Sequence, residues 1–197
     1  IRSLEIGVYH LHMPKFDSWG REDLLDYIKI GTDDRIYAIA QLLRMGVSVE
    51  EIVEKSTIDV FFIRKLRNII SMERELSGAV MDSSVYYQAK KMGFSDRAVA
   101  QLWNVPERKV FALRQSSNIR PVYKMIDSCA GEFDSYIPYF YSTYETENES
   151  VVSDKKKVIV LGSGPIRIGQ GVEFDYSTVH AIQTIKNAGY EAIIINN

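Results

Sequence analysis

The sequence predicts a mainly α-helical protein, with a helical domain built on a doubled helix-turn-helix unit and then the opening βαβ unit of an α/β domain. Three observations support this prediction. Helical periodicity runs from Trp19 to about Leu113, part of that region repeats at a fixed offset, and residues 155–197 alternate apolar runs with a glycine-rich loop and a helical stretch. We expect domains at 1–145 and 157–197, joined by a linker at 146–156.

Composition places the chain among ordinary globular proteins, with 197 residues of which 46% are hydrophobic and 25% charged. A net charge of −2 gives no global sign of binding to nucleic acid or to an anionic membrane. No apolar run has membrane length and no signal peptide is recognised. The single cysteine, Cys129, excludes a disulfide within one chain, which fits a cytoplasmic protein. The start at Ile1 and the end inside an α/β unit lead us to expect a piece of a longer protein.

Two histidines near the start, His10 and His12, alternate on an extended strip. A metal site would need a third ligand, and the next histidine is His180. We therefore interpret His10 and His12 as exposed structural residues and predict no metal site.

The first half of the helical domain is predicted to hold four helices, at 22–30, at 33–45, in a short stretch from 49, and at 59–76. Thr32 suits the N-cap of the second helix and Gly46 its end. Ser48, with Glu51 three residues later, has capping-box spacing before the short helix. The core face of the long helix would carry Phe62, Leu66, Ile69 and Ile70.

The same plan then recurs, because residues 41–67 align without a gap to residues 88–114 at an offset of 47. Gln, Met-Gly, Ser and Leu-Arg coincide in the two copies. The isoleucines Ile52, Ile58 and Ile63 fall opposite Val99, Val105 and Val110. Two copies are few for a solenoid, so we expect a compact helical domain made from a doubled unit.

The second copy supports an alternative function, that of a helix-turn-helix DNA-binding protein. Residues 84–120 hold seven Lys and Arg against two Asp and Glu, and 106–115 would form the recognition helix. Arg108, Lys109 and Arg114 would then face phosphates or bases. The same motif is also simply a good way to pack three helices.

The equivalent helix of the first copy begins with the apolar residues Val60, Phe61 and Phe62. Such a face favours an apolar partner over DNA. We predict that these three residues contribute to an oligomer interface, and nucleic acid is the less favoured partner.

After Asn118 the chain has neither a helical nor a strand period, and it is rich in aromatic residues. A cofactor box and a stacking platform for nucleic acid are two interpretations. We favour an extended segment that packs its aromatic rings onto a neighbouring surface while their polar tips reach water. The dense aromatic set is Tyr136, Tyr139, Phe140, Tyr141 and Tyr144.

Residues 158–161 form a short apolar run typical of a strand that is buried on both faces. A glycine-rich loop follows, then a helix at about 174–187 with Gly189 as its C-terminal cap, and a second strand at 192–195. Glycines let a backbone approach an anion, and the next helix points free N–H groups at it. A tight turn that binds nothing fits the pattern equally well.

The spacing argues against a dinucleotide site. Four residues separate Gly164 from Gly169, whereas the dinucleotide fingerprint has a shorter interval. The second strand ends in Asn196 and Asn197, which carry no charge with which to hold a ribose. A nicotinamide or flavin enzyme is therefore disfavoured.

The segment GSGPIRIGQGVEFDY at 162–176 is more specific than a glycine count. It resembles the start of the second synthetase half in the large subunit of the bacterial, glutamine-dependent carbamoyl phosphate synthetase family. The matching residues are Gly162, Gly164, Pro165, Arg167, Ile168, Gly169, Gln170, Gly171, Glu173, Phe174, Asp175, Tyr176, His180 and Ala181.

The rest of the chain is similar to the same family. LEIGV at 4–8, DRIYAIA at 34–40 and KKMGFSD at 90–96 resemble the helical oligomerisation domain between the two synthetase halves. The aromatic segment resembles the connection into the second half in bacterial two-subunit enzymes. It matches at Pro121, Val122, Tyr123, Lys124, Asp127, Cys129, Ala130, Glu132, Phe133 and the string YSTYE at 141–145.

The resemblance implies a ligase that makes carbamoyl phosphate from bicarbonate, glutamine or ammonia, and two ATP, for pyrimidine and arginine synthesis. It implies ATP, magnesium or manganese, and potassium as cofactors, and a small glutaminase subunit as partner. The ligands of these cofactors would lie mostly in ATP-grasp portions outside the chain. We therefore expect the chain to be inactive alone and to mediate assembly.

In this family the glycine loop belongs to the domain that precedes ATP-grasp, and it lines the second active site and the passage for carbamate. By motif, the candidates for this lining are Gly162, Gly164, Arg167, Gly169, Gln170, Gly171 and Glu173. Backbone amides and Arg167 suit an anion. Glu173 either orients the ligand or an arginine, or caps the helix, and we predict no catalytic residue.

Overall fold

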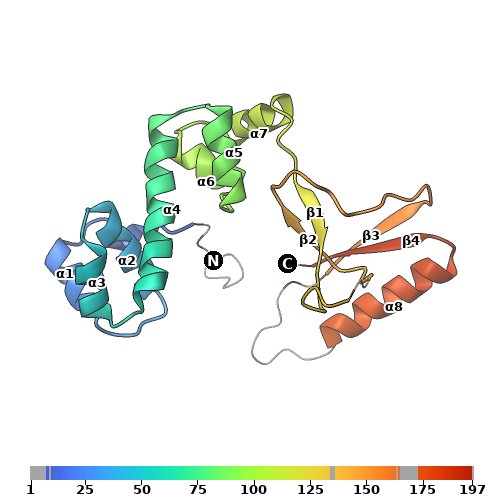
Figure 1. The fold of residues 1–197 in the computed structure, drawn as a ribbon, viewed down its shortest axis with the longest axis horizontal. Helices are drawn as coiled ribbons and strands as arrows, with labels where there is room; N and C mark the ends of the chain where they lie inside the picture. Colours follow the sequence, from blue (N-terminus) through green and yellow to red (C-terminus); the bar gives the residue numbers. More distant parts are fainter. Residues whose placement is uncertain (1–7, 9, 134–135, 163, 165–172, 197) are drawn as a thin grey trace. The chain divides into compact units, whose positions relative to one another are not determined.

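A computed structural model of the chain describes residues 8, 10–133, 136–162, 164 and 173–196. The described residues up to Ser150 form one compact unit, and those from Val151 form a second. In the first unit a 3₁₀ turn, η2, precedes the helices. The elements are η2 (Pro14–Phe16), α1 (Arg21–Tyr27), α2 (Arg35–Arg44), α3 (Val49–Ser56), α4 (Val60–Gly78), α5 (Ser83–Lys91), α6 (Asp96–Leu102) and α7 (Glu107–Ser116) (Figure 1).

The predicted repeat is confirmed, because α5, α6 and α7 follow α2, α3 and α4 at the expected offset. Gly46 ends α2 with φ +85°, and Gly93 follows α5 with φ +89°. In both copies a left-handed backbone is needed there for the turn into the next helix. Ser48 accepts a hydrogen bond from the Glu51 amide at 3.2 Å, and Ser95 caps α6 in the same way. The Thr32 cap is not found, since Asp34 stands at the N-cap of α2.

The long helix α4 belongs to two hydrophobic cores. Ile63 and Ile70 of α4 belong to a core with α1, α2 and α3, and Met72 and Leu76, further along the helix, belong to a core with α5, α6 and α7. Figure 1 shows these two groups at opposite ends of α4. The prediction that Phe62 faces the core is wrong, because its side chain is 59% exposed.

The aromatic segment forms an antiparallel hairpin of β1 (Val122–Met125) and β2 (Phe140–Thr143). The chain then returns along the free edge of β1. There Asn148 and Glu149 accept hydrogen bonds from the Tyr123 and Met125 amides at 2.9 and 2.7 Å. The first part of the predicted linker at 146–156 is thus bound to β1 through these side chains.

The second unit contains β3 (Lys157–Leu161), α8 (Glu173–Asn187) and β4 (Glu191–Ile195). The strands are parallel, with Lys157 opposite Glu191 and Leu161 opposite Ile195, as a βαβ unit requires. Gly189 has φ +84°, which confirms it as the cap of α8. The prediction of strands buried on both faces is wrong, because Ile159 is 57% and Leu161 77% exposed. Burial alternates along β3, so one helix covers one face.

Candidate functional site

The first turn of α4 presents two aromatic rings to solvent. Asp59 accepts a hydrogen bond from the Phe61 amide at 2.8 Å and so caps the helix under them. Phe61 and Phe62 are 56% and 59% exposed, and their ring centroids lie 5.4 Å apart in an edge-to-face arrangement. The Lys65 ammonium nitrogen lies 5.1 Å from the Phe61 ring centroid. The structure therefore brings two of the three predicted interface residues to the surface, whereas Val60 is partly buried against the first core.

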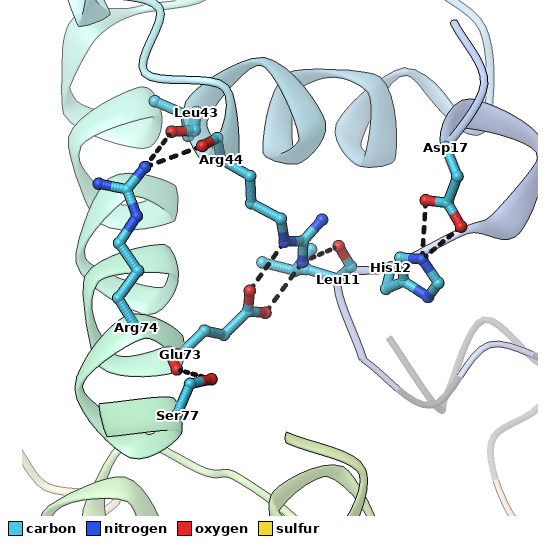
Figure 2. Close-up of polar contacts among 8 residues, drawn as sticks. All are labelled: Leu11, His12, Asp17, Leu43, Arg44, Glu73, Arg74 and Ser77. Carbon is cyan, nitrogen blue, oxygen red and sulfur yellow. Dashed lines mark hydrogen bonds and ion pairs between the residues drawn. The ribbon is translucent and has the colours of Figure 1, made fainter. Parts of the chain in front are cut away.

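A partly buried ion pair joins α2 to α4 further along the long helix, as Figure 2 shows. Arg44 donates to both carboxylate oxygens of Glu73, at 2.8 and 2.9 Å, and to the Leu11 carbonyl at 2.6 Å. Arg74 donates to the carbonyls of Leu43 and Arg44 at 3.0 Å each, where α2 ends. Bidentate pairing of this kind fixes orientation, so the two helices keep their relative register.

The N-terminal histidines lie beside this ion pair and are less exposed than predicted. His10 is partly buried, and burial, then the neighbouring His12, lower its pKa. His12 contacts Asp17 at 2.9 Å. Both histidines line a depression of about 330 Å³ with Arg44, Glu73 and two residues of α6. Among the described residues no group of three or more His, Cys, Asp or Glu is arranged to hold a metal ion.

In the second copy, Asp96 is the centre of a polar network. It accepts hydrogen bonds from the Tyr86 hydroxyl at 2.7 Å, the Lys90 ammonium at 2.8 Å and the Arg114 guanidinium at 3.0 Å. Burial alone would raise the pKa of Asp96, but the hydrogen bonds from Lys90, Tyr86 and Arg114 outweigh burial and lower it. Burial and the bond to Asp96 raise the pKa of Tyr86.

This network weakens the case for DNA binding. Arg114, which was expected to face phosphates or bases, is paired with Asp96, and its side chain is only 16% exposed. Lys90 is also paired and is 8% exposed. Two of the seven positive charges counted in the second copy are therefore bound to Asp96 inside the domain. The α6–α7 turn serves packing, since Val99 and Val110 are both fully buried.

The glycine loop is described at its two ends. The Gly162 amide donates to the Ile195 carbonyl at 2.8 Å, and the Gly164 amide donates to the Asn196 side-chain oxygen at 3.0 Å. Gly164 has φ +85°, a backbone that favours glycine. Glu173 is the first residue of α8, and its side chain is outside the description. The remaining loop candidates, which also lie outside the described residues, are Arg167, Gly169, Gln170 and Gly171.

Two family models match this chain. Residues 1–118 match the model of the carbamoyl-phosphate synthetase large chain, oligomerisation domain. The chain belongs to the carbamoyl phosphate synthetase large-chain family. Residues 154–197 match the model of the carbamoyl phosphate synthase preATP-grasp domain, in the order that the resemblance implied.

The helical unit of this synthetase chain is therefore an oligomerisation domain, and the exposed Phe61 and Phe62 belong to it. The family is one of ligases, and neither matching model describes a DNA-binding protein. The β3–α8–β4 unit is the start of the preATP-grasp domain. No helix in the described ranges has both the length and the apolarity that a membrane span needs.

Asn196 was not among the residues predicted for this site, and from the sequence it was noted only as a residue without charge. The structure shows that its side chain connects the end of β4 to the loop that follows β3. No sequence signal marks this contact, because the two residues are 32 positions apart.

Proposed function

We propose that this chain has two roles in the large subunit of a glutamine-dependent carbamoyl phosphate synthetase. Its helical domain joins copies of the subunit, and its preATP-grasp start forms part of the wall of the site where carbamate is phosphorylated. The observation that carries the first role is the exposed pair Phe61 and Phe62 on a domain of the oligomerisation family.

The geometry of the pair supports docking onto an apolar surface of a second copy. Both rings stand on the capped first turn of a 19-residue helix, so little side-chain or backbone order has to be gained on binding. Rigid aromatic residues of this kind are typical centres of binding energy at interfaces. Lys65, beside the Phe61 ring, supplies a charged edge to the apolar patch.

Light scattering behind size exclusion over a range of concentrations tests this assembly role. We expect the chain to form a concentration-dependent dimer or larger species, and F61S with F62S to shift it toward monomer. F111S is the matched control, since Phe111 is 49% exposed on the equivalent helix of the second copy, and it should leave association unchanged.

Two outcomes would contradict the assembly role. One is a chain that stays monomeric at high micromolar concentration. The other is a monomer that shifts on a DNA duplex, run in parallel, with added salt reversing the shift. The second outcome would favour the helix-turn-helix alternative.

The second role rests on the β3 loop. Gly164, with φ +85°, allows the backbone to approach a ligand closely, and Glu173 begins α8 further along the chain. We assign Arg167, Gly169, Gln170 and Gly171 to the wall on the motif alone. Glu173 has two roles open to it, orienting the ligand or an arginine, and capping α8.

The complete reaction belongs to the whole enzyme. A small glutaminase subunit would supply ammonia, and ATP, magnesium or manganese, and potassium would be held mostly by ATP-grasp residues beyond 1–197. The product would serve pyrimidine and arginine synthesis in the cytoplasm. We expect the 197-residue chain alone to release no ADP above blank when given ATP, bicarbonate and ammonia, and measurable ADP release would contradict this.

A further inference from the structure

The two parallel strands of the second unit end side by side, and Asn196 holds their ends together. It is the residue after β4, and its side-chain oxygen accepts the Gly164 amide proton at 3.0 Å. One residue earlier on β4, the Ile195 carbonyl accepts from the Gly162 amide at 2.8 Å. These two bonds fix the first residues of the loop where β3 ends.

Gly162 leaves room for this side chain. A Cβ atom built at position 162 would lie 2.6 Å from the Asn196 oxygen and 3.1 Å from the Asn196 Cβ. The close approach to the Asn196 Cβ shows that rotation of the amide alone would not relieve the clash. Gly162 and Asn196 therefore form one arrangement, in which the glycine is needed for the asparagine to reach Gly164.

Asparagine suits this position better than aspartate would if the ligand nearby is an anion. The carboxyl ends of parallel strands form the edge where α/β proteins bind their ligands. An asparagine supplies the oxygen that Gly164 requires, and its NH₂ group adds donors without a negative charge. An aspartate would supply the same acceptor, but its charge would repel an anion nearby.

We propose that Asn196 is a positioning residue of the carbamate-phosphorylating site, one that anchors the loop through Gly164 and adds no negative charge of its own beside an anionic ligand. This inference rests on the proposed function. The ligand class is a carbamate or its phosphorylated form, both of which are anions.

The reverse half-reaction of the full-length synthetase tests the assignment. Carbamoyl phosphate and ADP give ATP and carbamate. The bond between phosphorus and the carbamoyl oxygen breaks, carbamate leaves with the electron pair, and the terminal phosphate oxygen of ADP forms the new bond to phosphorus. We expect N196D to raise the KM for carbamoyl phosphate about tenfold, as a like charge near the anion would, with little change in kcat or in the KM for ADP.

N196A separates anchoring from charge. It removes the acceptor for Gly164 and adds no charge, so we expect it to lower kcat, with its KM for carbamoyl phosphate closer to the wild-type value than that of N196D. N187D is the matched control, because Asn187 ends α8 and its side chain pairs with Gln183. It should keep wild-type kinetics. Circular dichroism tests whether each variant is folded.

Different results would contradict the role of Asn196 and the proposed function of the enzyme. A folded N196D enzyme with the wild-type KM for carbamoyl phosphate would overturn the role of Asn196. The same holds if both variants at position 196 fail to fold, since the residue would then be purely structural. A wild-type enzyme that makes no ATP from carbamoyl phosphate and ADP would overturn the proposed function, and the inference with it.

Discussion

The two copies of the helical unit share a backbone, but a pair of buried positions is apolar in the first copy and charged in the second. In the first copy Leu43 and Val49 are 5% and 3% exposed and pack in the core. In the second copy the equivalent residues are Lys90 and Asp96, which form an ion pair at 2.8 Å with side chains 8% and 14% exposed. Two apolar core residues of the first copy thus correspond to a buried charge pair in the second, and the same helices form around both.

This difference shows that the shared backbone depends on the turns more than on the chemistry of these core positions. The glycine turns and the serine caps are the same in both copies. The polar pair has an additional consequence in the second copy. The Lys90 nitrogen lies 4.9 Å from the ring centroid of Tyr144, which follows β2, so the pair also anchors the chain that leaves the hairpin.

The largest expected effect comes from removing one member of the pair. D96A would leave Lys90 buried without its carboxylate, and we expect it to lower the free energy of unfolding by about 3–5 kcal/mol. Urea unfolding measures the loss. The two tryptophans report separately, since Trp103 lies in the second core and Trp19 packs against the first. The loss of stability reported by Trp103 should be larger than the loss reported by Trp19.

A triple variant sharpens the comparison by giving the second copy the apolar chemistry of the first. Y86F, K90L and D96V together remove the Lys90–Asp96 ion pair and the Tyr86 hydroxyl that bonds to it, while the Arg114 guanidinium, which is 16% exposed, is left to turn toward solvent. We expect its stability to equal or exceed that of the wild-type protein, because apolar replacement of a buried pair is often neutral or favourable. A triple variant as unstable as D96A would show that the pair is needed for the fold.

The next largest effect is expected on lowering the pH, which should destabilise the second copy more than the first. The folded-state pKa of Asp96 is lowered, so its contribution to stability is fully present above its unfolded pKa of about 4. That contribution is lost as the pH falls through the lower, folded value. Amide exchange in α6 should therefore accelerate below about pH 4 more than exchange in α3. The triple variant should lack the difference, and an unchanged difference would mean that another group titrates.

The smallest effect is expected at the turn before the third helix of each copy. Thr57 has φ +55° and the equivalent Asn104 has φ +52°. A β-branched residue is strained in this left-handed region, whereas asparagine tolerates it. We expect T57N to raise the unfolding free energy by roughly 1 kcal/mol and N104T to lower it by a similar amount. If urea unfolding showed that T57N is less stable than the wild-type protein, or that N104T is more stable, backbone strain would not explain the difference between the two turns.

Local signals explain which parts of the fold could be predicted. The turn at Gly46 and the cap at Ser48 act within a few residues, so the sequence shows them directly. The face of α4 was harder, because Phe62 lies at helical spacing from Leu66 and Ile69, which pack against the core, and yet Ile63 rather than Phe62 is buried. The alignment of Ile63 with Val110 was the signal that could have decided between Phe62 and Ile63.

Contacts between distant residues explain what was missed. The hairpin strands β1 and β2 are four residues long and carry no clear alternation, so neither was recognised. Asn148 and Glu149 hold β1 through side chains about 25 residues away. In the candidate loop, the glycines could be found by motif, but the bond between Gly164 and Asn196 depends on how the two strands are paired.

Helix α4 packs in the hydrophobic cores of both copies. An α-helix advances about 1.5 Å and turns about 100° with each residue. The number of residues between Ile63 in the first core and Leu76 in the second therefore sets the phase between the copies as well as their spacing. One inserted residue would turn the second copy by about 100° around the first, and it would also disturb one of the two cores or the bonds of Glu73 and Arg74 to the end of α2. A change in the length of α4 would therefore redirect one surface of the domain against the other only if these contacts were remade.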